Sequence, residues 1–315
     1  VLASPRFLFR AEIQPEPNNK DKVVLLDEYA LAARLSFFLW SSVPDDELLS
    51  LAYKKELRKN LRSQVDRMLK DSRSRRFVEN FVGQWLQSRD IEEFAIDPRR
   101  ILNTTSQLEA TKVFNGRVKK DMKTETEMFF EFVLKNDRPA EELISAKYSF
   151  LNSRLAKFYG VNGVVGEEHQ LVDLTEHPER GGILTQGTFL VVTSNPTRTS
   201  PVKRGLFVLD NLLGTPAPPA PPNVPELEVI AHKSKKPMTM RQMMEVHREK
   251  PICAGCHARM DPIGLGLENF NALGQFRSDE KGVKIDSGGQ LVTGEKFSNV
   301  TTLKSILADE RRDDF

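Results

Sequence analysis

The residues of this chain whose types and spacing could do chemistry are gathered in one stretch, Cys253-Ala254-Gly255-Cys256-His257. Its form, C-x-x-C-H, is the attachment signature of c-type haem, in which two thiols and one imidazole are delivered within about one turn of chain. Positions three and four apart share one face of a helix, so both sulfurs can reach the haem vinyl groups while the imidazole faces the iron. We therefore predict one covalent haem c, attached at Cys253 and Cys256, with His257 as the proximal iron ligand.

Two other interpretations of the cysteine pair stay open. A closed structural zinc site needs four ligands, usually from a second C-x-x-C or from paired histidines, whereas this chain has only 2 cysteines. A thioredoxin-like redox pair, or a structural disulfide, would use the same two thiols. The redox motif belongs near a βαβ pattern, but here the sequence reads as a helix followed by Asp261-Pro262-Ile263-Gly264.

The sixth iron ligand is the open question of this site. In many electron-transfer cytochromes c a downstream methionine fills the position, but neither methionine nor histidine follows Met260 in this sequence. Met260 is three residues from His257 on the proximal side, so it is a minor candidate. Water or a residue outside the given sequence could also fill the position. The upstream candidates are Met240, Met244, His247, His169 and His177.

Basic residues near an Asn-Pro-Thr-Arg-Thr-Ser-Pro run are candidates for pairing with haem propionates. An arginine fork matches carboxylate geometry, and the candidates, in order, are Arg198, Arg204 and Lys203. The alternative is that the run is loop and cap chemistry with exposed bases.

Three runs carry a resemblance to known families. They are CAGCHARMDPIGLGLENFNALGQFR at 253–277, TSNPTRTSPVKRGLFVLDNLLGTPAPPAPPNVP at 193–225, and LSFFLWSSVPDDELL at 35–49. The first two resemble the planctomycete-type cytochrome c-associated families, which are named as domains of unknown function, and the third is similar to the domain that precedes them. The resemblance implies a secreted or periplasmic haem protein, and it implies no established reaction.

Composition narrows the class of protein without naming a partner. The chain has 315 residues, 39% hydrophobic and 29% charged, which is typical of a globular protein long enough for two domains. A net charge of +2 gives no argument for nucleic acid, and no run reaches the about 18 apolar residues of a membrane span. Because the chain begins at Val1 and stops at Phe315 without an obvious structural end, we expect it to be a fragment of a larger protein.

Apolar residues at helical spacing predict an all-helical domain over residues 1–160, with no strand pattern. Loop and helices follow over 161–215, including at most one short strand at 169–174 and a helix capped by Ser200. Residues 216–225 hold six prolines in ten and predict a polyproline II spacer of roughly 30 Å. A haem c-binding module then occupies 226–315.

Within that module Thr239 and Gln242 have the T-x-x-Q form of a capping box, which opens a helix ending before Pro251. Asp261 and Pro262 are expected to cap and begin a further helix, which would run to Gly274. Residues 283–292 predict a hairpin with its turn at Gly288-Gly289, and a last helix is expected over 298–307. The predicted fold class is mainly α, a helical N-terminal domain plus a small cytochrome c-like helical module with a short β-hairpin.

These observations predict a c-type cytochrome that passes single electrons within a larger secreted or periplasmic protein. Its partner would be a redox protein or a neighbouring haem domain of the same chain, with no nucleic acid and no transmembrane segment. A haem peroxidase or oxidase with an open distal site, or a structural haem module, are the alternatives. The sequence does not decide whether the chain is an enzyme.

Overall fold

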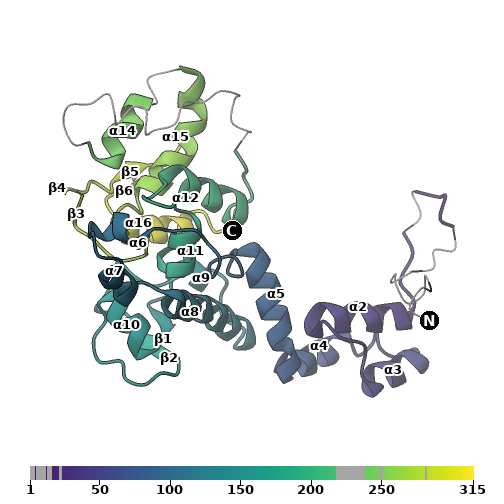
Figure 1. Ribbon diagram of the computed structural model, residues 1–315. Coiled ribbons are helices and arrows are strands. Elements are labelled where there is room, and N and C mark those ends of the chain that lie inside the picture. The colour runs from purple at the N-terminus through teal and green to yellow at the C-terminus, as the bar shows by residue number, and fades with distance from the viewer. Residues whose placement is uncertain are drawn as a thin grey trace. The chain divides into compact units, whose positions relative to one another are not determined.

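The computed structural model describes residues 4, 12, 16–20, 23–217, 238–247, 251–280 and 282–315 (Figure 1). The chain divides into two compact units, residues 1–80 and 81–315, which are considered separately below. The described residues are mainly helical, and their strands form three two-stranded sheets. The predicted mainly-α fold class is confirmed.

The first unit consists of short helices, and two of them begin at acidic caps. The side chains of Asp27 and Asp45 accept hydrogen bonds from the first-turn N–H groups of the helices that follow them, which satisfies donors that a helix start leaves unpaired. The elements are α2 (Glu28–Trp40), α3 (Asp46–Tyr53), α4 (Leu61–Lys70), the 3-10 turn η1 (Ser72–Ser74) and α5 (Arg75–Trp85), which runs past the boundary at residue 80.

Trp40 anchors the core of this unit. Its side chain is fully buried, and its indole Nε1 donates a hydrogen bond to the Met68 carbonyl oxygen at 3.0 Å. The guanidinium of Arg73 lies 3.5 Å from the centre of the indole ring, a cation–π contact. One aromatic side chain therefore joins the end of α2 to α4 and η1.

The second unit holds the C-x-x-C-H motif. Its first part comprises α6 (Pro98–Leu102), α7 (Gln107–Val113), α8 (Gly116–Lys135), α9 (Glu142–Ser145), β1 (Tyr148–Leu151), α10 (Ser153–Tyr159) and β2 (Gln170–Asp173). Its second part comprises η2 (Ile183–Thr185), α11 (Gly187–Val192), α12 (Pro201–Phe207), the π-helical turn η3 (Val208–Leu212), α14 (Met240–His247) and α15 (Pro251–Leu265). The chain ends with β3 (Asp279–Glu280), β4 (Val283–Lys284), β5 (Gly289–Gln290), β6 (Lys296–Phe297), α16 (Val300–Ser305) and the π-helical turn η4 (Ile306–Glu310).

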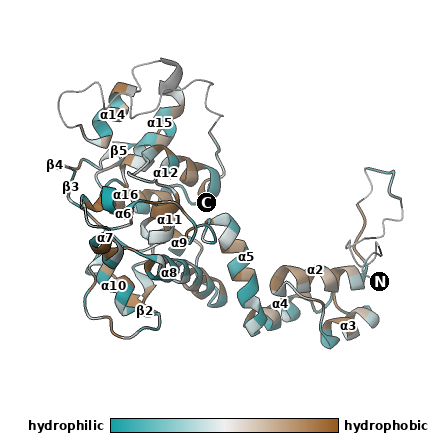
Figure 2. Cartoon of the chain, viewed as in Figure 1, coloured by the Kyte–Doolittle hydropathy of each residue, from teal (hydrophilic) through white to brown (hydrophobic). Residues whose placement is uncertain are grey.

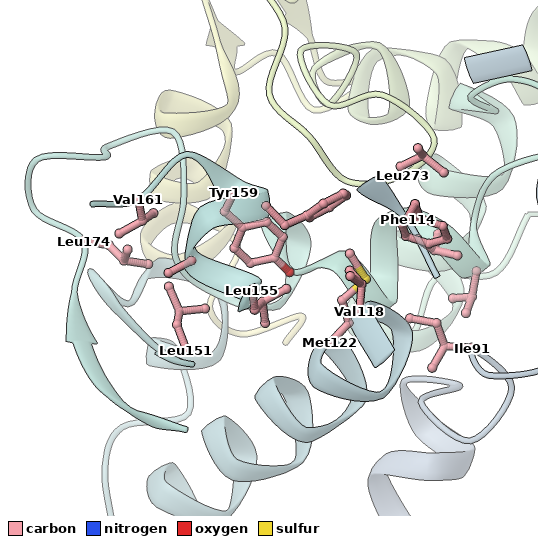
Figure 3. Packing of buried hydrophobic residues seen from close by; sticks show 14 residues of the cluster. Ile91, Phe114, Val118, Met122, Leu151, Leu155, Tyr159, Val161, Leu174 and Leu273 are labelled. Atoms are coloured by element: carbon pink, nitrogen blue, oxygen red, sulfur yellow. The ribbon is translucent and has the colours of Figure 1, made fainter. Parts of the chain in front are cut away.

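One hydrophobic cluster joins early and late segments of the second unit (Figure 3). Met122 of α8 and Leu155 of α10 are fully buried in it, and so is Leu273, which follows the motif helix by several residues. Every residue of α11 is also buried, and Figure 2 shows hydrophobic residues along this helix. The chain downstream of the motif therefore packs into the same core as α8 and α10.

Several local predictions are confirmed by the structure. The Ser200 side chain accepts a hydrogen bond from the Lys203 N–H, and Pro201 is the first residue of α12. Thr239 and Gln242 form both bonds of the predicted capping box, at 2.9 and 3.3 Å. The short strand expected over 169–174 is β2. In each case the signal is local, because the residues that form the feature are at most a few positions apart.

Other local predictions are wrong. Residues 1–160 are not free of strands, because β1 pairs antiparallel with β2, Tyr148 opposite Asp173. The hairpin expected over 283–292 is two separate pairings, since β4 pairs with β3 and β5 pairs with β6. A strand of two residues carries almost no sequence pattern, so register could not be inferred there.

The boundary between the two compact units does not coincide with the predicted domain boundaries. Residues 218–225 of the proline-rich segment lie outside the described residues. The helices on either side of that segment, α12 and α15, pack against each other within the second unit. The motif helix therefore shares a core with the chain that precedes the proline-rich segment.

Candidate functional site

The C-x-x-C-H motif lies in the first two turns of α15. Cys253, Cys256 and His257 belong to one continuous helix, and their spacing of three and four residues places them on one face of it. The side chain of Cys253 is outside the described part of the structure. Cys256 is a free thiol of intermediate exposure, and Gly255 beside it is exposed, with open space where a Cβ would project.

A buried carboxylate holds the motif histidine. The His257 ring Nδ1 lies 2.9 Å from the Asp261 Oδ1, one helical turn further along α15. Asp261 is fully buried and His257 is 9% exposed. Against an ionised carboxylate, which only accepts hydrogen bonds, Nδ1 is the nitrogen that carries the proton. Nε2 is then left with its lone pair, and the same pairing of histidine with carboxylate orients ligand histidines in many metal sites.

The predicted role of Asp261 as a helix cap is wrong. Asp261 and Pro262 both lie inside α15, which continues to Leu265. The helix expected to run to Gly274 is instead a chain of turns, with a bridge between Phe270 and Phe276. A signal for the true arrangement was present, because Asp261 is four residues from His257 and thus shares its helix face.

Two glycines let α12 and α15 cross with their backbones in contact. A Cβ at Gly205 would overlap the Met260 carbonyl oxygen, and a Cβ at Gly264 would overlap the Pro201 carbonyl oxygen. Close approach of this kind requires residues without a side chain. The crossing fixes the second half of the motif helix against α12, and Arg259 adds a hydrogen bond to the Thr215 carbonyl at 3.1 Å.

The turns that follow α15 are held by a buried ion network. The guanidinium of Arg204 is fully buried and donates hydrogen bonds to the carbonyls of Leu267 and Phe270 at 2.8 and 3.0 Å. The carboxylate of Glu268 accepts from Arg204 at 3.3 Å and from Arg277 at 3.0 Å. Thr199 donates to the same carboxylate at 2.8 Å. Burial lowers the pKa of Arg204 to about 10, so the guanidinium remains charged at neutral pH.

The three propionate candidates differ in their surroundings. Arg204 is occupied by the carbonyl and carboxylate contacts just described. Lys203 donates from Nζ to the Ser194 carbonyl at 3.2 Å, and burial lowers its pKa. Arg198 donates from Nη1 to the carbonyl of Thr199 at 3.0 Å. Arg198 and Lys203 thus contact backbone oxygens of the loop before α12, whereas Arg204 contacts those of the turns after α15.

The methionine candidates for the sixth ligand gather near the far end of the motif helix. Met240 and Met244 of α14 are almost fully buried and cluster with Leu265, the last residue of α15. Leu265 is about two helical turns beyond His257. Met260 is buried on the part of α15 that crosses α12. The side chain of His247, which ends α14, is outside the described part of the structure.

The two loop histidines contact other parts of the second unit. The Nε2 of His169 lies 3.1 Å from the Asp121 carbonyl oxygen on α8, and burial lowers the pKa of this imidazole. The Nδ1 of His177 lies 3.4 Å from a Glu179 carboxylate oxygen. These contacts involve α8 and the segment before η2, and neither involves α15.

The structure also shows residues that the sequence did not single out. Among them are Asp261 and Glu268, the buried carboxylates that contact His257 and Arg204. Glu268 could not be found from spacing, because its partner Arg204 lies 64 residues away. Within the described residues no group of three or more His, Cys, Asp and Glu side chains is arranged to hold a metal ion. In the same part of the chain no helix is long and apolar enough to cross a bilayer.

The fold and the site define a mainly helical protein with a C-x-x-C-H helix built into its second unit. Residues 26–161 match the family model PSD4, a protein of unknown function (DUF1592), and residues 180–280 match PSCyt3, a protein of unknown function (DUF1588). Both are planctomycete cytochrome c-associated domains, so the expected family association is confirmed at this level. Comparison with curated proteins found no significant match. Comparison with solved structures found none either.

Proposed function

We propose that this chain is a c-type cytochrome, which binds one haem through Cys253, Cys256 and His257 and passes single electrons. The observation that carries the proposal is the placement of these three residues in the first turns of α15, with the Nδ1 of His257 2.9 Å from Asp261. The donor set fits haem c, because two thiols and one oriented imidazole are what its attachment needs.

Attachment requires no oxidant or additional reactant. Each cysteine S–H would add across one vinyl group of the haem, forming a C–S bond, and the hydrogen would go to the neighbouring carbon. Cys256 is partly exposed, and Gly255 next to it has open space around it, so this turn of the helix can be reached from outside. His257 would bind through Nε2 while Asp261 holds the opposite side of the ring.

Bound haem supplies a reversible one-electron change at its iron. The chain's own contribution is to keep the ligand still, because α15 crosses α12 with backbone contact and the following turns are held by Arg204 and Glu268. Electron transfer requires that the ligand move little between the oxidised and reduced states of the iron. The partner would be another redox protein or a neighbouring haem domain, and because covalent attachment of this type is made outside the cytoplasmic membrane, we expect the protein to lie there.

The proposal is tested by producing the full chain in a host that attaches haem c and extracting it with acidified acetone. Haem should stay with the wild-type chain and with the control His177→Ala, because His177 is outside α15. It should be lost in the Cys253→Ala, Cys256→Ala double variant. Haem that resists extraction in the double variant would sink the proposal.

Optical spectra of the same samples then separate electron transfer from catalysis. A low-spin haem that can be reduced and reoxidised reversibly and ignores cyanide supports electron transfer, because a filled sixth position leaves nothing to bind. Individual substitutions of Met240, Met244 and His247 should identify which of them, if any, supplies that ligand. A high-spin ferric haem that shifts with cyanide would contradict simple electron transfer.

A further inference from the structure

The carboxylate of Asp261, which contacts the motif histidine, can influence a group that this histidine binds. Asp261 is fully buried, and its Oδ1 lies 2.9 Å from Nδ1 of His257. A carboxylate that accepts this proton gives the imidazole partial anionic character and makes Nε2 a stronger electron donor. Its negative charge also stabilises the more positive of two oxidation states nearby, and burial reduces the screening by water.

We propose that Asp261 is a positioning residue that sets the reduction potential of the haem at a low value, by holding His257 as a hydrogen-bonded, electron-rich ligand. This inference rests on the proposed haem attachment and deepens it. The site would therefore be a low-potential centre, which favours the ferric state and needs a strongly reducing donor.

The surroundings of Asp261 keep this pair in place. Asp261 follows Met260, whose carbonyl oxygen faces Gly205 across the helix crossing, and Gly264 lies one turn later against Pro201. The backbone of this segment therefore cannot shift without separating α12 from α15. The nearest basic residue along the helix, Arg259, donates to the Thr215 carbonyl. The carboxylate is carried by the same helix as the ring that it contacts, one turn away.

The test is the midpoint potential of the haem-loaded chain. Asp261→Asn keeps the size of the side chain and removes its charge. We expect the potential to rise by an amount equal to at least a tenfold change in the ratio of oxidised to reduced haem, about 59 mV for one electron. Asp261→Glu, which restores a charged acceptor, should move the potential back toward the wild-type value. The control Asp286→Asn removes a charge whose side chain is 72% exposed and should leave the potential unchanged.

A second measurement needs no substitution at Asp261. In the reduced, haem-loaded wild-type chain the Nδ1 proton of His257 should be visible by NMR and exchange slowly with water, because it is donated to a buried carboxylate. A potential that stays the same in Asp261→Asn, or an Nδ1 proton that exchanges rapidly, would overturn the inference. Either result with haem still attached would leave the cytochrome proposal intact, so the two failures can be told apart.

Discussion

Asp261 and Glu268 are buried carboxylates at the end of the motif helix and just beyond it, and they have different partners. Glu268 contacts two arginines and a threonine hydroxyl, and one of those arginines also holds the carbonyls of the turns. Asp261 contacts the imidazole of His257 on its own helix. A carboxylate surrounded by fixed positive charge serves the fold, whereas one that faces a ring able to bind a metal on its other side can serve the site.

The largest effect is expected at Glu268, the carboxylate that supports the fold. Arg204→Met removes the cation from a fully buried pair and leaves Glu268 with Arg277 alone, a change of the kind that costs about 3–5 kcal/mol. Calorimetry should show a large fall in the melting temperature of the second unit. The exposed pair of Arg62 and Asp66 provides a control, since Arg62→Met should not change melting measurably. An unchanged melting temperature in Arg204→Met would show that the network does not support the fold.

Glu125 on α8 is another buried carboxylate. It extends the comparison because the two side chains that donate hydrogen bonds to it are both hydroxyls. Ser149 and Tyr159 each donate to it at 2.6 Å, and burial raises its pKa from 4.5 to about 7. The folded state therefore holds this proton at pH values where the unfolded chain has lost it. The contribution of Glu125 to the free energy of unfolding should be greatest below pH 4.5 and should fall as the pH rises toward 7.

The expected loss across that range is about 3 kcal/mol, from a shift of roughly two and a half pKa units. Glu125→Gln cannot lose a proton, so the slope of unfolding free energy against pH should become shallower in this range. Urea unfolding at several pH values measures that slope for both chains. Equal slopes in the wild type and the variant would mean that Glu125 is not protonated in the folded state.

A smaller effect is expected at the helix crossing that supports both carboxylates. Gly264→Ala places a methyl group against the Pro201 carbonyl, and overpacking of this kind costs about 1–3 kcal/mol. Gly116→Ala on α8 is the matched control, because a Cβ there meets nothing within 4 Å and alanine favours a helix by about 1 kcal/mol. If both variants melted alike, the backbone contact between α12 and α15 would be absent in solution.

The features that the sequence predicted correctly depend on neighbouring residues. Ser200 with Pro201, and Thr239 with Gln242, start helices through contacts made within one turn. The motif is equally local, since its three residues are nearly consecutive, and its role in haem attachment stays a prediction. Pro262 misled the prediction because proline usually begins a helix, yet here it is accommodated inside one that is packed against α12.

The features that were missed depend on residues far apart in the sequence. The role of Arg204 is set by the carbonyls of Leu267 and Phe270, which only the folded chain brings near it. The pairing of β1 with β2 spans α10 and a loop, and its four-residue strands carry little pattern. The four-residue spacing of His257 and Asp261 does predict that they contact each other on a helix. The Asp-Pro pair, however, was interpreted as the start of a new helix.

The most direct test of the central claim is the intact mass of the full chain, denatured after production in a host that attaches haem c. The account predicts a mass greater than that of the polypeptide by one haem, and a protease digest that places the addition on the peptide containing Cys253 and Cys256. A chain with the mass of the bare polypeptide, or one lighter by the two hydrogens of a disulfide, would contradict it.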